Sequence, residues 1–222
     1  MSTPTTTSRA ERTLATRRRM VRTAYDSFCA DGYLGTTVSA VAKEAGVAVP
    51  TVYYTFGTKA ALLREALGAA IVGFDLWRKP PPEPIDVAEV LPWHAWWAEF
   101  EAAPTSQQAL EVFLTHGVGI LQRVGPLVTA MHGATGDAEA AEVVRIAEER
   151  RVEAYRQAVR VIAGKPGGLR RGLTVAAGTD IVVVLFSAEL YEALSVGRGW
   201  SHRRCLTFFR EILTAQLIGA PA

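Results

Sequence analysis

The 222-residue sequence predicts an all-α protein, and three observations support this prediction. Apolar residues recur with helical spacing, as Val21, Ala24 and Phe28 do within residues 14–30. Thr, Ser or Asp precedes many of these segments, and their side-chain oxygens can accept the unpaired N–H groups of a helix start. Glycine or proline follows many segments, as Gly32 follows the first, and both residue types end helices.

Composition favours a folded protein over a disordered one. Hydrophobic residues make up 49% of the chain and charged residues 21%, so a packed core can form. The two cysteines, Cys29 and Cys205, lie far apart in the sequence, which argues against a disulfide framework and favours a reducing compartment. The polar N-terminus does not resemble a signal peptide, and Asp180 interrupts the most apolar run, residues 173–188. We therefore expect a cytoplasmic protein without a membrane span.

Positive charge is concentrated at the N-terminal end. Residues 1–60 contain eight Lys and Arg against four acidic residues, a balance of +4, whereas the remainder carries −2. Such an asymmetry indicates that this end meets a polyanion. Residues 1–12 are predicted to be a disordered basic arm that either follows DNA phosphates or only solubilises the chain.

Residues 36–59 read as two short helices joined by a tight turn. Thr36 or Thr37 can cap the first helix, and Gly46 stands where that helix must stop. Pro50 falls in the first turn of the second helix, where its missing N–H costs little. This order of helix, glycine turn and helix is the helix-turn-helix pattern, in which the second helix enters the major groove of DNA.

The individual residues of this stretch are more specific than the general helix-turn-helix pattern. Thr37-Val38, Val41-Ala42, Ala45-Gly46-Val47, Thr51-Val52-Tyr53, Phe56 and Lys59 resemble the DNA-binding domain of the tetracycline-repressor (TetR) family of bacterial transcription regulators. Residues 187–191 and 198–201 resemble a subset of its regulatory domains. The resemblance implies a DNA-binding domain over residues 13–59 and a ligand-binding and dimerisation domain over residues 60–222.

We expect DNA contacts from ten residues. Val49 and Thr51 suit base edges, and the hydroxyls of Tyr53 and Thr37 suit phosphates. The resemblance implies a phosphate contact for Lys59. Ala48 and Pro50 depart from the Ser and Gly usual in the family. The full expected set is Arg17, Arg18, Thr37, Lys43, Val49, Pro50, Thr51, Tyr53, Tyr54 and Lys59.

An aromatic stripe follows the proline-rich residues 79–84. Trp93, Trp96, Trp97 and Phe100 have the spacing of one helix face, and they form either ordinary core or part of a ligand pocket. His94 is expected to be exposed. His116 and Tyr155 are either core residues or polar anchors for a ligand. The full pocket prediction is Trp77, Trp93, Trp96, Trp97, Phe100, Phe113, His116, Met131 and Tyr155.

Two last helices are predicted, over residues 172–196 and 201–218. The first is apolar on nearly all sides, so it must be buried on more than one side. It is either a central helix of a monomer or, as the resemblance implies, part of a four-helix dimer interface. The expected interface residues are Ile181, Val184, Leu185, Ala188, Leu206, Phe209 and Leu213.

No catalytic motif occurs in the sequence. It has no glycine-rich phosphate loop, nucleophile elbow or His-Glu metal helix, and its four histidines lack ligand spacing. We expect no enzyme activity, no cofactor and no metal. The expected function is a homodimeric repressor that leaves a pseudo-palindromic operator when a small apolar or aromatic ligand binds. The alternatives are a regulator controlled by a partner protein and an all-helical enzyme.

Overall fold

The computed structural model describes residues 9–78, 80 and 85–218. Every regular element in these ranges is helical, which confirms the predicted fold class. The chain divides into two compact units, one spanning residues 1–81 and 129–144 and the other residues 82–128 and 145–222. Helix α9 (Ala138–Ala163) contributes its first residues to the first unit and its remaining residues to the second.

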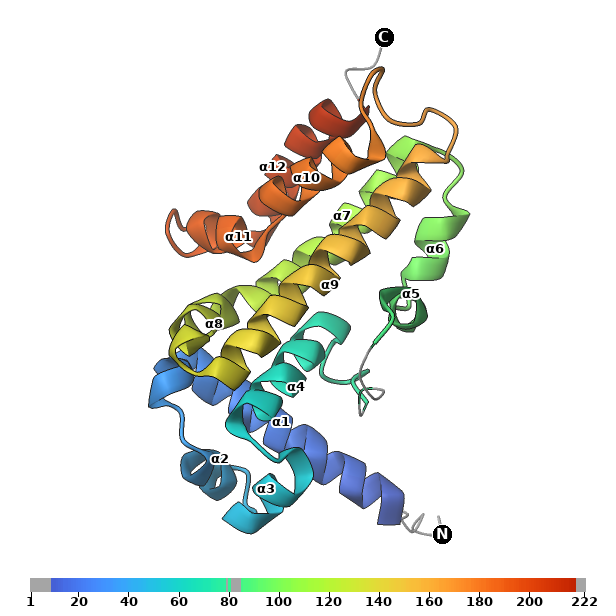
Figure 1. Cartoon of the computed structure of the whole chain (residues 1–222). Helices are drawn as coiled ribbons and strands as arrows, with labels where there is room; N and C mark the ends of the chain where they lie inside the picture. The colour runs from blue at the N-terminus through green and yellow to red at the C-terminus, as the bar shows by residue number, and fades with distance from the viewer. Residues whose placement is uncertain (1–8, 79, 81–84, 219–222) are drawn as a thin grey trace, which may run out of the picture. The chain divides into compact units, whose positions relative to one another are not determined.

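Four helices from the N-terminal part of the chain build most of the first unit. They are α1 (Arg9–Gly35), α2 (Val38–Glu44), α3 (Val49–Phe56) and α4 (Lys59–Val72). α1 packs against α4, and α2 and α3 complete the unit (Figure 1). Phe28 of α1 and Leu62 and Leu63 of α4 are fully buried between the helices. Most of α8 (Val128–Gly133) and a 3-10 turn (Ala134–Gly136) also belong to this unit.

The second unit has a single hydrophobic core formed by helices α6, α7 and α9 to α12. Besides α9, the elements of this unit are, in chain order, α5 (Val87–Val90), a 3-10 turn (Leu91–Trp93), α6 (Trp97–Ala102), α7 (Ser106–Val124), a 3-10 turn (Gly125–Leu127), α10 (Val175–Leu185), α11 (Ala188–Ser195), α12 (His202–Leu213) and a π-helical turn (Thr214–Ile218).

The N-terminal boundary differs from the prediction. α1 begins at Arg9, inside the segment that we expected to be a disordered arm, and residues 1–8 of that arm lie outside the described residues. The helix continues past the predicted end at Ala30, and its backbone changes direction at Gly32. Gly32 has φ +70°, a conformation that glycine adopts without the steric cost of a side chain.

The predicted helix over residues 172–196 is two helices. Phe186 ends α10 with φ −113° and ψ 64°, and the Ser187 hydroxyl starts α11 by accepting the Leu190 N–H at 3.2 Å. Tyr155 donates its hydroxyl proton to the Phe186 carbonyl at 2.8 Å. A tertiary hydrogen bond therefore satisfies the carbonyl at the break, which helical periodicity alone could not predict.

The aromatic stripe does not lie on one helix. Leu91–Trp93 is a 3-10 turn, His94 is extended, and α6 begins only at Trp97. Trp93 is 45% exposed, whereas Trp97 and Phe100 are buried. The prediction that all four aromatic residues share one helix face was wrong, because Pro92 starts a separate short turn before α6.

Candidate nucleic-acid interface and ligand-binding region

The helix-turn-helix forms as predicted. Thr37 caps α2 by accepting the Ala40 N–H at 3.1 Å. Gly46 has φ +64°, and the Val47 N–H after it donates to the Ala42 carbonyl at 2.9 Å, which closes the turn. Ala48 gives α3 no side-chain cap, and Pro50 lies in the first turn. Local sequence therefore determines both ends of this motif.

One face of α3 is buried and the other is open. Val52 and Phe56 are buried, as expected of core residues. Tyr54 is 93% exposed and Tyr53 is 51% exposed, although both side chains are large and aromatic. The other expected contacts in the motif, Thr37, Lys43, Val49, Pro50 and Thr51, are exposed or half-buried. The structure thus leaves a polar and aromatic face available on the second helix of the motif.

Arg17 and Arg18 have internal partners that the sequence did not reveal. The Arg17 guanidinium forms a two-point ion pair with Glu65 of α4, whose side chain is only 4% exposed, and lies 4.9 Å from the Phe56 ring centre. Arg18 donates to the Trp77 carbonyl at 2.9 Å. A buried carboxylate requires a partner of this kind. Both arginines therefore have partners within the unit, and a phosphate contact for them stays a prediction.

Lys59 also has an internal role. Its ammonium donates to the carbonyls of Tyr33 at 2.9 Å and Thr36 at 3.2 Å, and it lies 4.1 Å from the Tyr33 ring centre. These carbonyls lie at and just beyond the end of α1, where a cation is favourable. A DNA phosphate is therefore not required to explain the positive charge of Lys59 at the start of α4. An ammonium has three donors, so a phosphate contact through the third stays a prediction.

Residues 137–139 join the helix-turn-helix to the start of α9. The Tyr33 hydroxyl donates to the Asp137 carboxylate at 2.8 Å, and the Thr58 hydroxyl donates to Glu139 at 2.6 Å. Asp137 also caps α9, as predicted, by accepting the N–H groups of Glu139 and Ala140. The Ala140 N–H and then the Tyr33 hydroxyl lower the pKa of Asp137, because hydrogen bonds favour its charged form.

The family comparison agrees with this geometry. Residues 21–66 match the model of the bacterial regulatory proteins of the tetR family, and this range covers most of α1, the helix-turn-helix and the start of α4. Residues 21–66 therefore form a DNA-binding domain of the TetR type. α3, with its open face, is the second helix of the helix-turn-helix within this matched range.

Solved structures share the fold over nearly the whole chain. A protein from Saccharomonospora viridis, described as a transcriptional regulator in complex with choline, is 17% identical with a TM-score of 0.65 and covers 92% of this chain and 98% of its own. NalD of Pseudomonas aeruginosa, the secondary repressor of the MexAB-OprM multidrug efflux pump, is 16% identical with a TM-score of 0.59 and covers 92% and 96%. The fatty acid degradation regulator FadR of Bacillus halodurans is 13% identical with a TM-score of 0.60 and covers 89% and 94%. No curated protein matches the sequence.

Several of the aromatic residues predicted for a ligand pocket fill space within the second unit. Phe113 of α7 packs against Phe100, Tyr155 and Phe186, with ring centres 5.2–6.2 Å apart. Burial raises the pKa of Tyr155 to about 12, so its hydroxyl stays neutral and donates to Phe186. These side chains pack as a core, and their role in a pocket remains a prediction.

The remaining pocket residues occupy different surroundings. His116 stacks on Trp96 with ring centres 5.7 Å apart and planes 5° apart, and its Nε2 atom lies 3.7 Å from Glu99. Trp77 and Met131 belong to the first unit, unlike the other predicted pocket residues. His94 is half-buried rather than exposed, and burial lowers its pKa.

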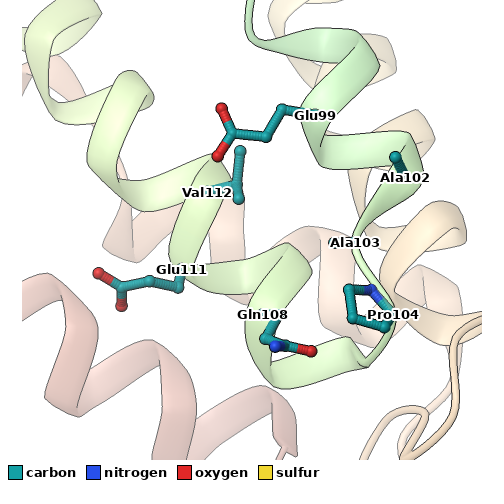
Figure 2. A pocket seen from close by; sticks show the side chains of 7 residues that line it. All are labelled: Glu99, Ala102, Ala103, Pro104, Gln108, Glu111 and Val112. Carbon is teal, nitrogen blue, oxygen red and sulfur yellow. The ribbon is translucent and has the colours of Figure 1, made fainter.

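A surface hollow of about 420 Å³ lies between α6 and the start of α7 (Figure 2). In Figure 2, the Glu99 side chain extends toward Val112, whereas the Glu111 side chain extends away from Pro104. Glu111 is paired with Arg210 of α12, and this pairing lowers the pKa of Glu111. The residues that line the hollow are Glu99, Ala102, Ala103, Pro104, Gln108, Glu111 and Val112, and none of them was predicted.

The predicted dimer residues fall into two groups. Val184 of α10 is 67% exposed, and Ile181, Leu185 and Leu206 are half-buried. Ala188, Phe209 and Leu213 are instead buried within the subunit. The prediction that these three contact a partner is therefore corrected, because their side chains pack in the core of their own subunit.

The described part of the chain contains no candidate for a metal site, a disulfide or a membrane-spanning helix. No group of three or more His, Cys, Asp or Glu residues there could hold a metal ion. Cys205 is buried and Cys29 is partly buried, and neither forms a disulfide. Within the same residues, no helix is both long and apolar enough to cross a membrane.

Proposed function

We propose that this protein is a homodimeric TetR-family repressor that leaves a pseudo-palindromic operator when a small ligand binds. The observation that carries the DNA-binding part is the open face of α3. An aromatic side chain that is 93% exposed, as Tyr54 is, loses apolar burial unless a partner covers it. The adjoining groups, the Tyr53 hydroxyl and the exposed Thr37, suit phosphate contacts.

The proposal of a homodimer rests on α10 and α12. α10 contains the run Ile181-Val182-Val183-Val184-Leu185, yet the core of the unit buries Val182 fully and leaves Val184 mostly exposed. Leu206 of α12 adds a half-buried apolar side chain. A second copy of the chain, related by two-fold symmetry, would cover these residues and present two α3 helices to successive major grooves.

The proposal that a ligand changes DNA binding is supported by helix α9, because this one helix contributes residues to both units. Its capping residue Asp137 and its residue Glu139 accept hydrogen bonds from Tyr33 and Thr58 of the first unit. Its later residues Ala158, Val159 and Ile162 belong to the core of the second unit. A ligand that prefers one conformation of the second unit would shift DNA affinity by its difference in affinity for the two states. The choline complex of the Saccharomonospora viridis protein suggests a small organic effector.

A second candidate is a TetR-family regulator that a partner protein controls. The close packing of Phe100, Phe113 and Phe186 favours it, because these side chains already fill the space that an aromatic ligand would need. The two candidates share the same DNA-binding function and differ only in what releases the operator.

Selection of bound duplexes from a random DNA pool tests the proposal. The expected result is a family of sequences with two-fold related half-sites about 10 base pairs apart, or a multiple of that spacing. Enrichment of a single asymmetric half-site would contradict the homodimer. Failure to enrich any sequence would contradict operator recognition itself.

A further inference from the structure

Two glycines at and just after α7 make room for side chains that follow α10. A Cβ atom on Gly117 would lie 2.7 Å from the Phe186 ring, and a Cβ atom on Gly125 would lie 2.4 Å from the carboxylate oxygen Oε1 of Glu192. Gly125 has φ −47° and ψ −52°, which any residue can adopt. The approach of the Glu192 side chain, rather than the backbone conformation, therefore favours a small residue at position 125.

The Glu192 carboxylate is partly buried and lacks a compensating charge. Within the described residues, it takes part in no hydrogen bond or ion pair. Burial alone raises its pKa, with no contribution from a neighbouring cation. A carboxylate that loses water without gaining a partner destabilises the fold. Such a group needs an explanation other than stability.

A second unpaired polar group lies on the same helix. The Ser195 hydroxyl oxygen is inaccessible to solvent and has no hydrogen-bond partner in the described part of the chain. Ser195 follows Glu192 by three residues, so the two side chains lie on neighbouring turns of one face of α11. α11 packs against α7 and the turn at Gly125–Leu127, where Leu121 and Leu127 are buried. The two polar groups thus lie on one side of α11, the helix that packs against α7 and this turn.

We propose that Glu192 and Ser195 bind the cationic group of a small organic effector with N–H donors, an alkylammonium or arylalkylammonium ion. Its N–H groups donate to the carboxylate and to the hydroxyl oxygen, which satisfies both unpaired acceptors. An anion is repelled by Glu192, and a neutral molecule leaves the charge unpaired. This assignment rests on the proposed ligand response and specifies the chemical class of the effector.

The stability of the ligand-free protein provides a first test. The change Glu192→Gln keeps the shape of the side chain and removes its charge, and Glu189→Gln is the matched control on the exposed side of the same helix. We expect the thermal midpoint of the Glu192→Gln protein to equal or exceed that of the wild type, and the control to match the wild type. A clear loss of stability for Glu192→Gln alone would show a structural partner and would overturn the proposal.

Calorimetric titration at pH 7.5 provides the second test. The probes are phenethylamine and a series of n-alkylamines, each compared with the alcohol of the same carbon skeleton. At least one amine is expected to bind the wild type and the Glu189→Gln control at least tenfold more tightly than its alcohol. Glu192→Gln should remove that preference, and Ser195→Ala should weaken it. Equal binding of amines and alcohols, or no binding of any amine, would overturn the assignment.

A gel shift with the selected operator separates this site from the proposed function. Release of the operator by the bound amine supports both. Amine binding that depends on Glu192 but leaves the operator bound supports the cation site and contradicts ligand-relieved repression. Release by an uncharged compound, unaffected by Glu192→Gln, supports repression and contradicts the cation site.

Discussion

The hydroxyl of Tyr33 donates a hydrogen bond of 2.8 Å to the Asp137 carboxylate, which joins the end of α1 to the residue that caps α9. The change Tyr33→Phe removes this bond and leaves the stack of Tyr33 on Phe28 unchanged. We expect the protein to lose about 1 kcal/mol of unfolding free energy, as is usual for one hydrogen bond. Chemical denaturation measures this loss. An unchanged midpoint would show that the bond contributes nothing.

The pH dependence of stability gives a second prediction on the same pair. The pKa of Asp137 is lowered in the folded protein, so its stabilising effect is full above the unfolded pKa of about 3.9 and is lost as the pH falls through the folded pKa. Asp137→Asn keeps a capping oxygen but cannot titrate. The wild type should therefore lose stability relative to this variant only in acid. A difference between the two proteins that is constant over pH 3–7 would contradict the prediction.

The close approach at Gly117 gives a third prediction. In Gly117→Ala the new methyl group would lie 2.7 Å from the Phe186 ring, which is buried in the core. We expect a loss of about 1–3 kcal/mol, typical of overpacking. Gly119→Ala is the control on the same helix, because its Cβ would meet only the Arg123 guanidinium at 3.6 Å. This control should gain about 0.5–1 kcal/mol from helix propensity, and equal effects of the two changes would refute the argument.

The proposed dimer gives a fourth prediction. Val184→Asp places a charge on the exposed side of α10 without disturbing the core. If α10 lies in the interface, analytical ultracentrifugation should find this variant largely monomeric at concentrations where the wild type is a dimer, because burying an unpaired charge is costly. Val196→Asp, at a residue that is 74% exposed after α11, should remain dimeric. Dimerisation of both variants would exclude Val184 from the interface.

Local signals predicted the elements near the DNA-binding face well. Thr37, Thr58 and Asp137 cap the expected helices, and Gly46 makes the expected turn. These features depend on residues a few positions apart, so the sequence displays them directly.

Features that depend on distant partners were not predictable. The ion pair between Arg17 and Glu65 joins residues 48 positions apart, and the only hint was an acidic residue among the apolar positions of α4. At the break between α10 and α11, the Phe186 carbonyl accepts a hydrogen bond from the hydroxyl of Tyr155, 31 residues earlier. The family resemblance placed Phe209 and Leu213 in a dimer interface, but an apolar sequence does not show whether its own subunit or a partner covers it.

We propose that the open face of α3 recognises an operator. The most direct test is a gel shift with DNA from immediately upstream of the coding region, for the wild type and Tyr54→Ala, over a range of salt concentrations. We expect a saturable and sequence-selective complex whose affinity falls steeply with salt. Tyr54→Ala should weaken this complex while leaving the thermal midpoint unchanged, since the side chain is 93% exposed. A wild-type complex that is equally strong on any DNA sequence, or that is unaffected by Tyr54→Ala, would contradict recognition through this face.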